Sequence, residues 1–251
     1  MIRFALVFLL LVSLAFTAPA TARADDASTL HELAVQALIQ GDFDKGLQLL
    51  DQALAADPEH LDSLRERAIF YIHTGKAEAA MADLDQALEL HPDDAESNYW
   101  RGFLHIEIEH FTSAVEDFSA CLAVQPDHIQ ALTGRALAFS LLERGEEALA
   151  DAGRVIELAP DETGPYMDRT RYLLRMGRVE EALADLGKAE ELAPEDPMPR
   201  MLSARVLLME GRFAQAITHA DQALNISPDS SDAKLLLALA NLAKERSVQD
   251  D

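Results

Sequence analysis

The sequence predicts an all-helical solenoid, in which six helix-turn-helix repeats of 34 residues stack and a terminal helix caps the stack. The first observation is a set of prolines that recur every 34 residues: Pro58, Pro92, Pro126, Pro160, Pro194 and Pro228. A fixed period of this length is typical of stacked helix pairs. The second observation is the spacing of apolar residues, as in Leu47, Leu50 and Leu54, which follows the helical and not the strand period.

Small residues keep the same phase as the prolines. Twenty-four residues before each proline stand Ala34, Ala68, Gly102, Ala136, Thr170 and Ala204. Twelve before each proline stand Gly46, Ala80, Ala114, Ala148, Ala182 and Ala216. Two helices can approach closely where neither carries a bulky side chain, so these positions predict the contact within each helix pair. Glycines 17 residues before the proline indicate the turn in four repeats: Gly41, Gly75, Gly177 and Gly211.

Each repeat therefore supplies two helices. We expect them at 28–40 and 43–56 in the first repeat and at 62–74 and 77–90 in the second, after a short polar lead at 25–29. An acidic residue follows every proline, where it meets the positive end of the next helix. The predicted repeats are 27–60, 61–94, 95–128, 129–162, 163–196 and 197–230. Residues 231–246 have the spacing of a first helix with no second helix after it, as expected of a capping helix.

The first 24 residues have the features of a cleaved signal peptide. Residues 4–16 are all apolar or small; they follow Arg3 and precede an Ala-Arg-Ala sequence at 22–24. An uncleaved membrane anchor is the alternative, but a membrane span needs about 20 apolar residues. No cysteine lies near the cleavage site to accept a lipid. We therefore expect a single solenoid domain, residues 25–251, that is periplasmic or secreted and does not insert into the membrane.

Composition narrows the range of partners. The 251 residues are 49% hydrophobic, which is enough for a continuous core, and the net charge of -23 is strongly acidic. An acidic surface repels nucleic acid and anionic membranes. Cys121 is the only cysteine, so no intrachain disulfide can form, and its position in the repeat is that of a small core residue.

Arginine and aspartate recur together in four of the repeats, 25 and nine residues before the proline. We expect pairing within each repeat: Arg67 with Asp83, Arg101 with Asp117, Arg135 with Asp151 and Arg169 with Asp185. Pairing one repeat forward would leave Arg67 facing Leu49 and Asp185 facing Ser203. A charged binding strip is the functional alternative. We favour partly buried structural pairs, because each arginine adjoins the small packing residue of its helix.

The sequence carries no catalytic or metal-binding motif. None of the eight histidines pairs with another four residues away near a third ligand, and there is no C-x-x-C sequence. A G-x-S-x-G elbow and a phosphate-binding glycine loop are also absent. Acidic pairs such as Asp93 and Asp94 do not have the spacing of a calcium loop. We expect a protein that is not an enzyme and uses no cofactor or metal.

Over residues 27–246 the chain resembles the tetratricopeptide repeat family. The third repeat comes close to the family signature through Gly102, Ala114, Phe118 and Pro126, although Asn98, Arg101 and His105 replace its usual Trp, Leu and Tyr. The resemblance implies a right-handed α-solenoid that serves as a protein-binding scaffold, with a concave groove lined mainly by the first helix of each repeat. Partners differ from one such protein to another, so the resemblance does not name one.

Mapped onto this chain, the resemblance implies a groove that changes from apolar and aromatic to methionine-rich and cationic. Its candidate partner-binding residues are Arg65, Ile69, Tyr99, Phe103, Met167, Arg171, Arg175, Met201, Arg205 and Met209. Arginine holds a carboxylate through two hydrogen bonds, and methionine adapts to varied apolar side chains. We expect an acidic and apolar peptide, a partner helix or a free C-terminus at repeats 5 and 6. The alternative is that these arginines pair with acids such as Asp168 and only hold the stack together.

The sequence thus predicts a non-catalytic adaptor for another protein or peptide, with envelope assembly or the regulation of envelope enzymes as its setting. A second hypothesis is a structural protein that self-assembles, with Tyr99, Trp100 and Phe103 receiving the terminal helix of another copy. A third, a hydrolase, has no residue constellation to support it.

Overall fold

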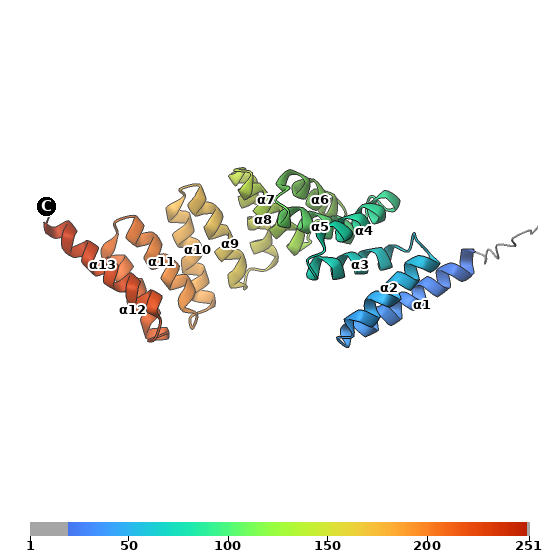
Figure 1. The fold of residues 1–251 in the computed structure, drawn as a ribbon. Helices are drawn as coiled ribbons and strands as arrows, with labels where there is room; N and C mark the ends of the chain where they lie inside the picture. The colour runs from blue at the N-terminus through green and yellow to red at the C-terminus, as the bar shows by residue number, and fades with distance from the viewer. Residues whose placement is uncertain (1–19, 250–251) are drawn as a thin grey trace, which may run out of the picture. The chain divides into compact units, whose positions relative to one another are not determined.

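The computed structural model describes residues 20–249, and over these residues every regular element is an α-helix (Figure 1). Thirteen helices follow one another in the described residues, and consecutive helices pack as pairs. This confirms the predicted all-α class and its helix-pair repeat. The chain divides into two compact units, which meet in sequence between Pro92 and Asp93, and each unit is described by itself. That residues 25–251 form a single domain stays a prediction.

The first unit contains the helices of the first two repeats. They are α1 (Ala20–Ile39), α2 (Phe43–Ala56), α3 (Leu61–His73) and α4 (Ala77–Leu90). Helix α1 begins at Ala20, so the polar stretch 25–29, expected to precede the first helix, is itself helical. Residues 1–19 of the signal peptide predicted at 1–24 lie outside the described residues.

The second unit contains the remaining helices. They are α5 (Ala95–Glu107), α6 (Phe111–Val124), α7 (Ile129–Leu141), α8 (Gly145–Leu158), α9 (Thr163–Arg175), α10 (Val179–Leu192), α11 (Pro197–Met209), α12 (Phe213–Ile226) and α13 (Ser231–Gln249). Helix α13 continues three residues beyond the predicted end of the capping helix at 246.

The turn between the two helices of a repeat closes in the same way in all six. An amide N–H beyond the turn donates to a carbonyl five residues back, as from Asp42 to Ala37 and from Arg178 to Leu173. This closure needs a left-handed residue, which glycine supplies without a steric penalty. Gly41, Gly75, Gly177 and Gly211 have φ between 72° and 80°. The other two repeats use Glu109 and Glu143, each with φ of 61°.

Side-chain caps begin several of the first helices. Asp94 accepts a hydrogen bond from the Ser97 amide and Asp196 from the Met198 amide. Histidine side chains cap two other helices. Nδ1 of His60 accepts a hydrogen bond from the Ser63 amide at the start of α3, and Nδ1 of His128 accepts one from the Ala131 amide at the start of α7. These bonds satisfy amide groups that have no partner within the helix.

The core consists of the small residues that mark the repeat and of the larger apolar residues between them. All twelve small positions named in the sequence are buried. Phe118 on α6 is only 1% exposed, and Gly102 and Gly134 make room for it. A Cβ at residue 134 would lie 2.5 Å from the Phe118 Cζ atom, closer than carbon atoms pack. Among the described residues, none of the helices is both long and apolar enough to cross a bilayer.

Candidate partner-binding site

Four arginines on first helices hold four buried aspartates on the second helices of the same repeats. The pairs are Arg67 with Asp83, Arg101 with Asp117, Arg135 with Asp151 and Arg169 with Asp185. In each pair the arginine Nε and Nη2 donate to the two carboxylate oxygens over 2.6–2.9 Å. The aspartates are 5–7% exposed. Two parallel bonds of this kind fix the angle between the paired helices, so these residues belong to the framework around the site.

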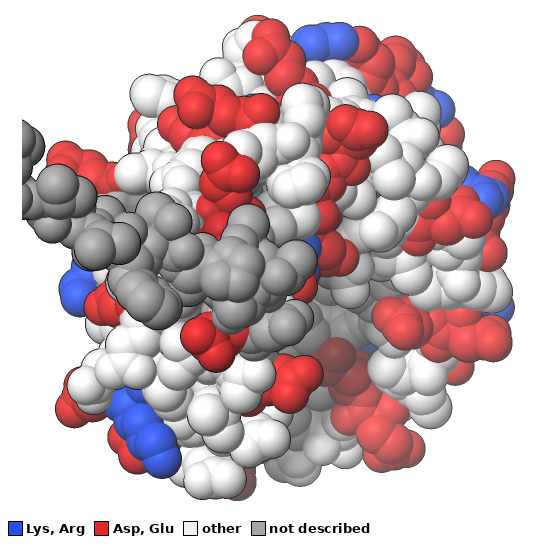
Figure 2. Space-filling view, turned by 90° about the vertical axis from the view of Figure 1, so that its right-hand side faces the viewer, with Lys and Arg blue, Asp and Glu red and all other residues white. Residues whose placement is uncertain are grey.

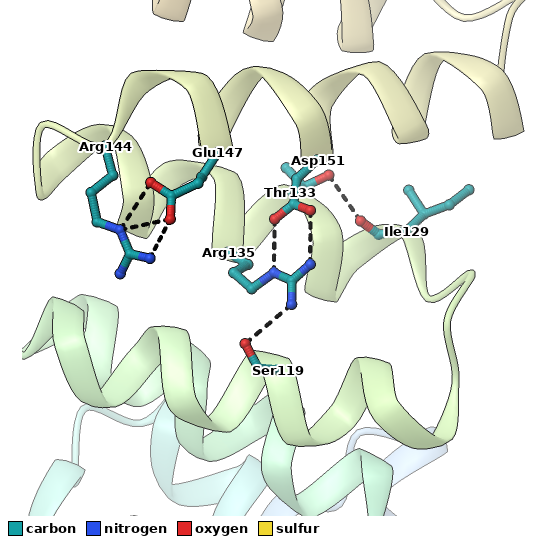
Figure 3. A network of polar contacts seen from close by, with 7 residues as sticks. All are labelled: Ser119, Ile129, Thr133, Arg135, Arg144, Glu147 and Asp151. Carbon is teal, nitrogen blue, oxygen red and sulfur yellow. Dashed lines mark hydrogen bonds and ion pairs between the residues drawn. The ribbon is translucent and has the colours of Figure 1, made fainter.

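The third nitrogen of the guanidinium reaches back to the preceding second helix. Nη1 of Arg67 donates to Asp51 over 2.8 Å. Figure 3 shows the equivalent bond of Arg135, whose Nη1 donates to the Ser119 hydroxyl over 3.1 Å. The residue that corresponds to Asp51 and Ser119 beside Arg169 is Gly153. A Cβ atom added to Gly153 would lie 4.0 Å from Nη1 of Arg169. The hydrogen bonds to Asp185 raise the pKa of Arg169, so its guanidinium stays charged.

Helices α7, α9 and α11 line an open hollow of about 600 Å³ in the second unit. It is lined by Leu137, Met167, Arg171, Arg175, Leu202 and Arg205, together with other residues of the same helices. A second hollow of about 440 Å³ lies between α11 and α13 and is lined by Met198, Met201 and Leu235. Leu202 and Arg205 line both. We call the two together the methionine–arginine hollow; volumes of this size are common in ligand pockets.

The arginines of this hollow differ in their surroundings. Arg171 forms an ion pair with Asp168, one turn earlier on its own helix. Arg175 and Arg205 have no hydrogen bond or ion pair within the described residues. Every other arginine from Arg65 to Arg212 has an acidic, amide, hydroxyl or carbonyl partner. The sequence holds 44 Asp and Glu residues against 21 Lys and Arg, so two unpaired cations in one hollow are unusual for this chain. Acidic side chains also predominate on the face shown in Figure 2.

The remaining predicted groove residues lie elsewhere. Arg65 and Ile69 belong to the first unit, where Arg65 donates to Asp62 over 2.5 Å. Met209 is 81% exposed and lines neither part of the hollow. The structure therefore brings together Met167, Arg171, Arg175, Met201 and Arg205 but not the whole predicted set.

The aromatic residues predicted for the groove pack mainly on one another. The rings of Tyr99 and Trp100 are 5.1 Å apart, and those of Trp100 and Phe103 are 5.9 Å apart. The ring of Tyr99 also packs on the ring of His128, with 4.9 Å between the ring centroids, and lies against Phe118 of the core. Burial raises the pKa of the Tyr99 hydroxyl. All three aromatic residues are partly buried.

Two lining residues of the hollow were not foreseen. Ser140 on α7 and Tyr172 on α9 are 6% and 5% exposed, yet both line the large hollow. The sequence held a signal for Ser140, because the other five repeats carry an aliphatic residue there: Leu38, Ile72, Ile106, Leu174 and Leu208. Tyr172 had no comparable signal, since its equivalents include Phe70, Ala138 and Val206.

Other groups that could do chemistry are structural where the chain is described. Cys121 is fully buried, and burial raises the pKa of its thiol to about 11, so the unreactive thiol form prevails. His105 packs at the inner end of α5, with Nε2 at 3.7 Å from the Asp117 carboxylate. In the described part of the chain no three His, Cys, Asp or Glu side chains gather as metal ligands would.

The fold and the hollow define a helical-repeat protein whose first helices line an open cavity. The chain belongs to the tetratricopeptide repeat family: models of this family match residues 33–98, 101–163 and 167–231. No curated protein sequence matches the chain.

Solved structures of similar fold include several members of the same family. PilW, described as a widely conserved type IV pilus biogenesis factor, is 20% identical, with a TM-score of 0.70 over 84% of this chain and 98% of that chain. YrrB, described as having an unusual peptide-binding site, is 22% identical, with a TM-score of 0.63 over 78% and 97%. A tetratricopeptide repeat protein from Parabacteroides merdae is 23% identical, with a TM-score of 0.59 over 85% and 84%. At these identities the likeness concerns the fold.

Proposed function

We propose that this protein is a non-catalytic adaptor that holds a partner protein or peptide in the methionine–arginine hollow. The observation that carries the proposal is the pair of cations Arg175 and Arg205, which have no partner in the described residues and lie beside Met167, Met201 and Leu202. An acidic and apolar segment would complete both the charge and the apolar surface. The arginines bind carboxylates, and the thioethers adapt to aliphatic or aromatic side chains.

We assign arginine two roles in this chain. Arg135 and Arg169 donate hydrogen bonds to buried aspartates and hold helix pairs together. Arg205 is exposed and makes no such bond, so it does not stabilise the stack through an ion pair. We assign the alternative role, in which a groove arginine only holds the stack together, to Arg171, which binds Asp168, and not to Arg175 or Arg205.

We place this adaptor in the periplasm or outside the cell, as the predicted signal peptide suggests, and assign it to envelope assembly or to the regulation of envelope enzymes. Among proteins of similar fold, PilW is described as a pilus biogenesis factor and YrrB as having a peptide-binding site. Both descriptions are compatible with a scaffold that acts by binding. The proposal includes no catalytic step, because the hollow contains no nucleophile paired with a base in the described residues.

Site-specific photocrosslinking tests this proposal. A photoreactive benzoylphenylalanine replaces Met198, which is 54% exposed and lines the hollow, or Val124, which is 51% exposed and lines neither part of it. Both variants of residues 25–251 are irradiated with an envelope extract of the source cells. We expect one discrete crosslinked partner from position 198 and none from position 124. The same products from both positions, or none from 198, would count against the hollow as the binding site.

Self-assembly is the competing hypothesis, and solution mass distinguishes it. An adaptor keeps a constant molar mass as the concentration of the purified chain rises. A self-assembling protein increases in mass with concentration, and its crosslinks from position 198 would join two copies of the chain. Light scattering coupled to size-exclusion chromatography measures the first quantity, and mass spectrometry of the crosslinked product identifies the second.

A further inference from the structure

We propose that Ser140, Tyr172 and Arg175 form a carboxylate-binding subsite at one end of the methionine–arginine hollow. The proposal rests on the proposed function, because it names the chemical group of the partner that docks there. Ser140 belongs to α7, and Tyr172 and Arg175 lie almost one turn apart on α9. All three line the 600 Å³ hollow and also a neighbouring recess of about 330 Å³. They therefore stand where the two spaces adjoin.

The two hydroxyl groups lack partners of their own. Ser140 and Tyr172 are more than nine-tenths buried, and neither hydroxyl makes a hydrogen bond within the described residues. The hydroxyl oxygens themselves keep contact with solvent at the hollow, so a ligand bound there can replace water as their hydrogen-bond partner. Burial raises the pKa of Tyr172 to about 12, so its hydroxyl keeps its proton and can donate. Together with the unpaired guanidinium of Arg175, the subsite offers several donors that make no hydrogen bond to the described residues.

Comparison between repeats shows that the fold does not require these side chains. The positions equivalent to Ser140 in the other five repeats are leucine or isoleucine. The positions equivalent to Arg175 are Ile39, His73, Glu107, Leu141 and Met209. Only the fourth and fifth repeats combine a hydroxyl on one first helix with an arginine on the next. A polar group at a position that is apolar elsewhere in the stack is what a binding role would produce.

The charges nearby favour a single negative charge on the ligand. Asp168 lines the hollow and already engages Arg171, and Glu143 lines the recess. A dianionic phosphate would be repelled by these two carboxylates, and Arg175 is the one unpaired arginine at this end that could offset the repulsion. A monoanionic carboxylate matches the one free guanidinium and accepts two hydrogen bonds from it. The carboxylate could be supplied by an acidic side chain or by the C-terminus of the partner.

Peptide display supplies a probe without knowledge of the natural partner. Random twelve-residue peptides displayed with free C-termini are selected on residues 25–251. We expect enrichment of peptides in which a carboxylate lies beside aliphatic, aromatic or methionine side chains. The most enriched peptide is then synthesised in three further forms: with an amidated C-terminus, with each acid replaced by its amide, and with phosphoserine in place of the acid. The first two forms show which carboxylate is bound.

Three variants test the residues. Y172F removes one hydroxyl, and the double variant S140I/R175L installs residue types that other repeats carry at the same positions, as in Ile106 and Leu141. We expect about tenfold weaker binding in Y172F and a larger loss in the double variant, with unchanged helicity and melting temperature. R154L is the matched control, because Arg154 is exposed on α8 and lines neither the hollow nor the recess. Fluorescence anisotropy measures the affinities.

The outcomes separate this inference from the proposed function. If the wild-type chain selects no peptide, both fail. If it selects peptides that bind Y172F and S140I/R175L as tightly as the wild type, the subsite is wrong and the adaptor function stands. Tighter binding of the phosphoserine form would overturn the assignment to a carboxylate. Loss of binding in both subsite variants, with R154L unaffected, would support it.

Discussion

Arg135 on α7 binds Asp151 on α8 with both its Nε and its Nη2, each 2.8 Å from one carboxylate oxygen (Figure 3). The aspartate side chain is 9% exposed, whereas the arginine side chain keeps 22% of its surface in contact with solvent. The charge that needs compensation is therefore the aspartate, and the arginine connects it to solvent. The same relationship recurs in three other repeats, so it is part of the architecture.

Removing Arg135 alone should destabilise the protein more than removing both partners. We expect R135M to lower the free energy of unfolding by about 2–3 kcal/mol, less than for a fully buried pair because the arginine is partly exposed. The double variant R135M/D151L should recover most of this loss. Urea denaturation measures both. As a control, E147Q breaks the exposed pair with Arg144 and should hardly shift the midpoint. Equal losses in the single and double variants would contradict the pairing.

Filling the gap in front of Arg169 should stabilise the second unit. G153S adds a helix-favouring side chain and a hydroxyl near Arg169 Nη1, the position at which Ser119 serves Arg135. G187S is the matched control, because the arginine position opposite it is Ser203 and nothing lies within 4 Å of its Cβ. The higher helix propensity of serine should raise the free energy of unfolding of both variants by about 0.5 kcal/mol. The hydrogen bond to Arg169 should add about 1 kcal/mol in G153S. Equal gains would exclude the added hydrogen bond.

Glycine should be preferred at both turn positions that hold glutamate. Glu109 has a φ of 61°, a region in which a side chain with a Cβ is strained. We expect E109G to raise the free energy of unfolding by up to about 1 kcal/mol, since the relief of strain exceeds the entropy of glycine in the unfolded chain. G75A should lower the free energy of unfolding by about 1–2 kcal/mol, because Gly75 has a φ of 72°, where a residue with a Cβ is strained. The added Cβ would meet no atom within 4 Å, so backbone strain is the whole cause. Thermal melting of both variants checks the sign.

Mild acid should destabilise the protein through His31. Burial lowers the pKa of His31, and the neighbouring carboxylates of Asp62 and Glu66 oppose that shift without cancelling it. As pH falls through about 6.5, the unfolded chain binds a proton at this residue before the folded chain does, so stability is lost. The melting temperature should therefore fall between pH 7.5 and pH 5.5, and it should fall less in H31Q. An identical fall in both proteins would rule out His31 as the source.

Local features of the repeat could be predicted from the sequence. The helices α2 (Phe43–Ala56) and α4 (Ala77–Leu90) have the bounds expected from the pattern. The turn glycine, the capping residue and the apolar period that set those bounds all lie within a few residues of the helix ends. The arginine–aspartate register was equally accessible, because the repeats that carry one residue also carry the other. The ends of the stack were less predictable: α1 begins earlier and α13 ends later than expected, because no neighbouring repeat marks those ends.

By itself, the sequence determined the helical class, the 34-residue period, the small residues at helix contacts and the pairing within repeats, since each follows from chemistry that recurs at a constant spacing. Only the tertiary structure decided that Arg171 binds Asp168 while Arg175 and Arg205 have no partner in the described residues. It also decided that Ser140 and Tyr172 share a hollow with Arg175. These facts depend on how side chains from three different helices approach one another, and a one-dimensional pattern does not contain those distances.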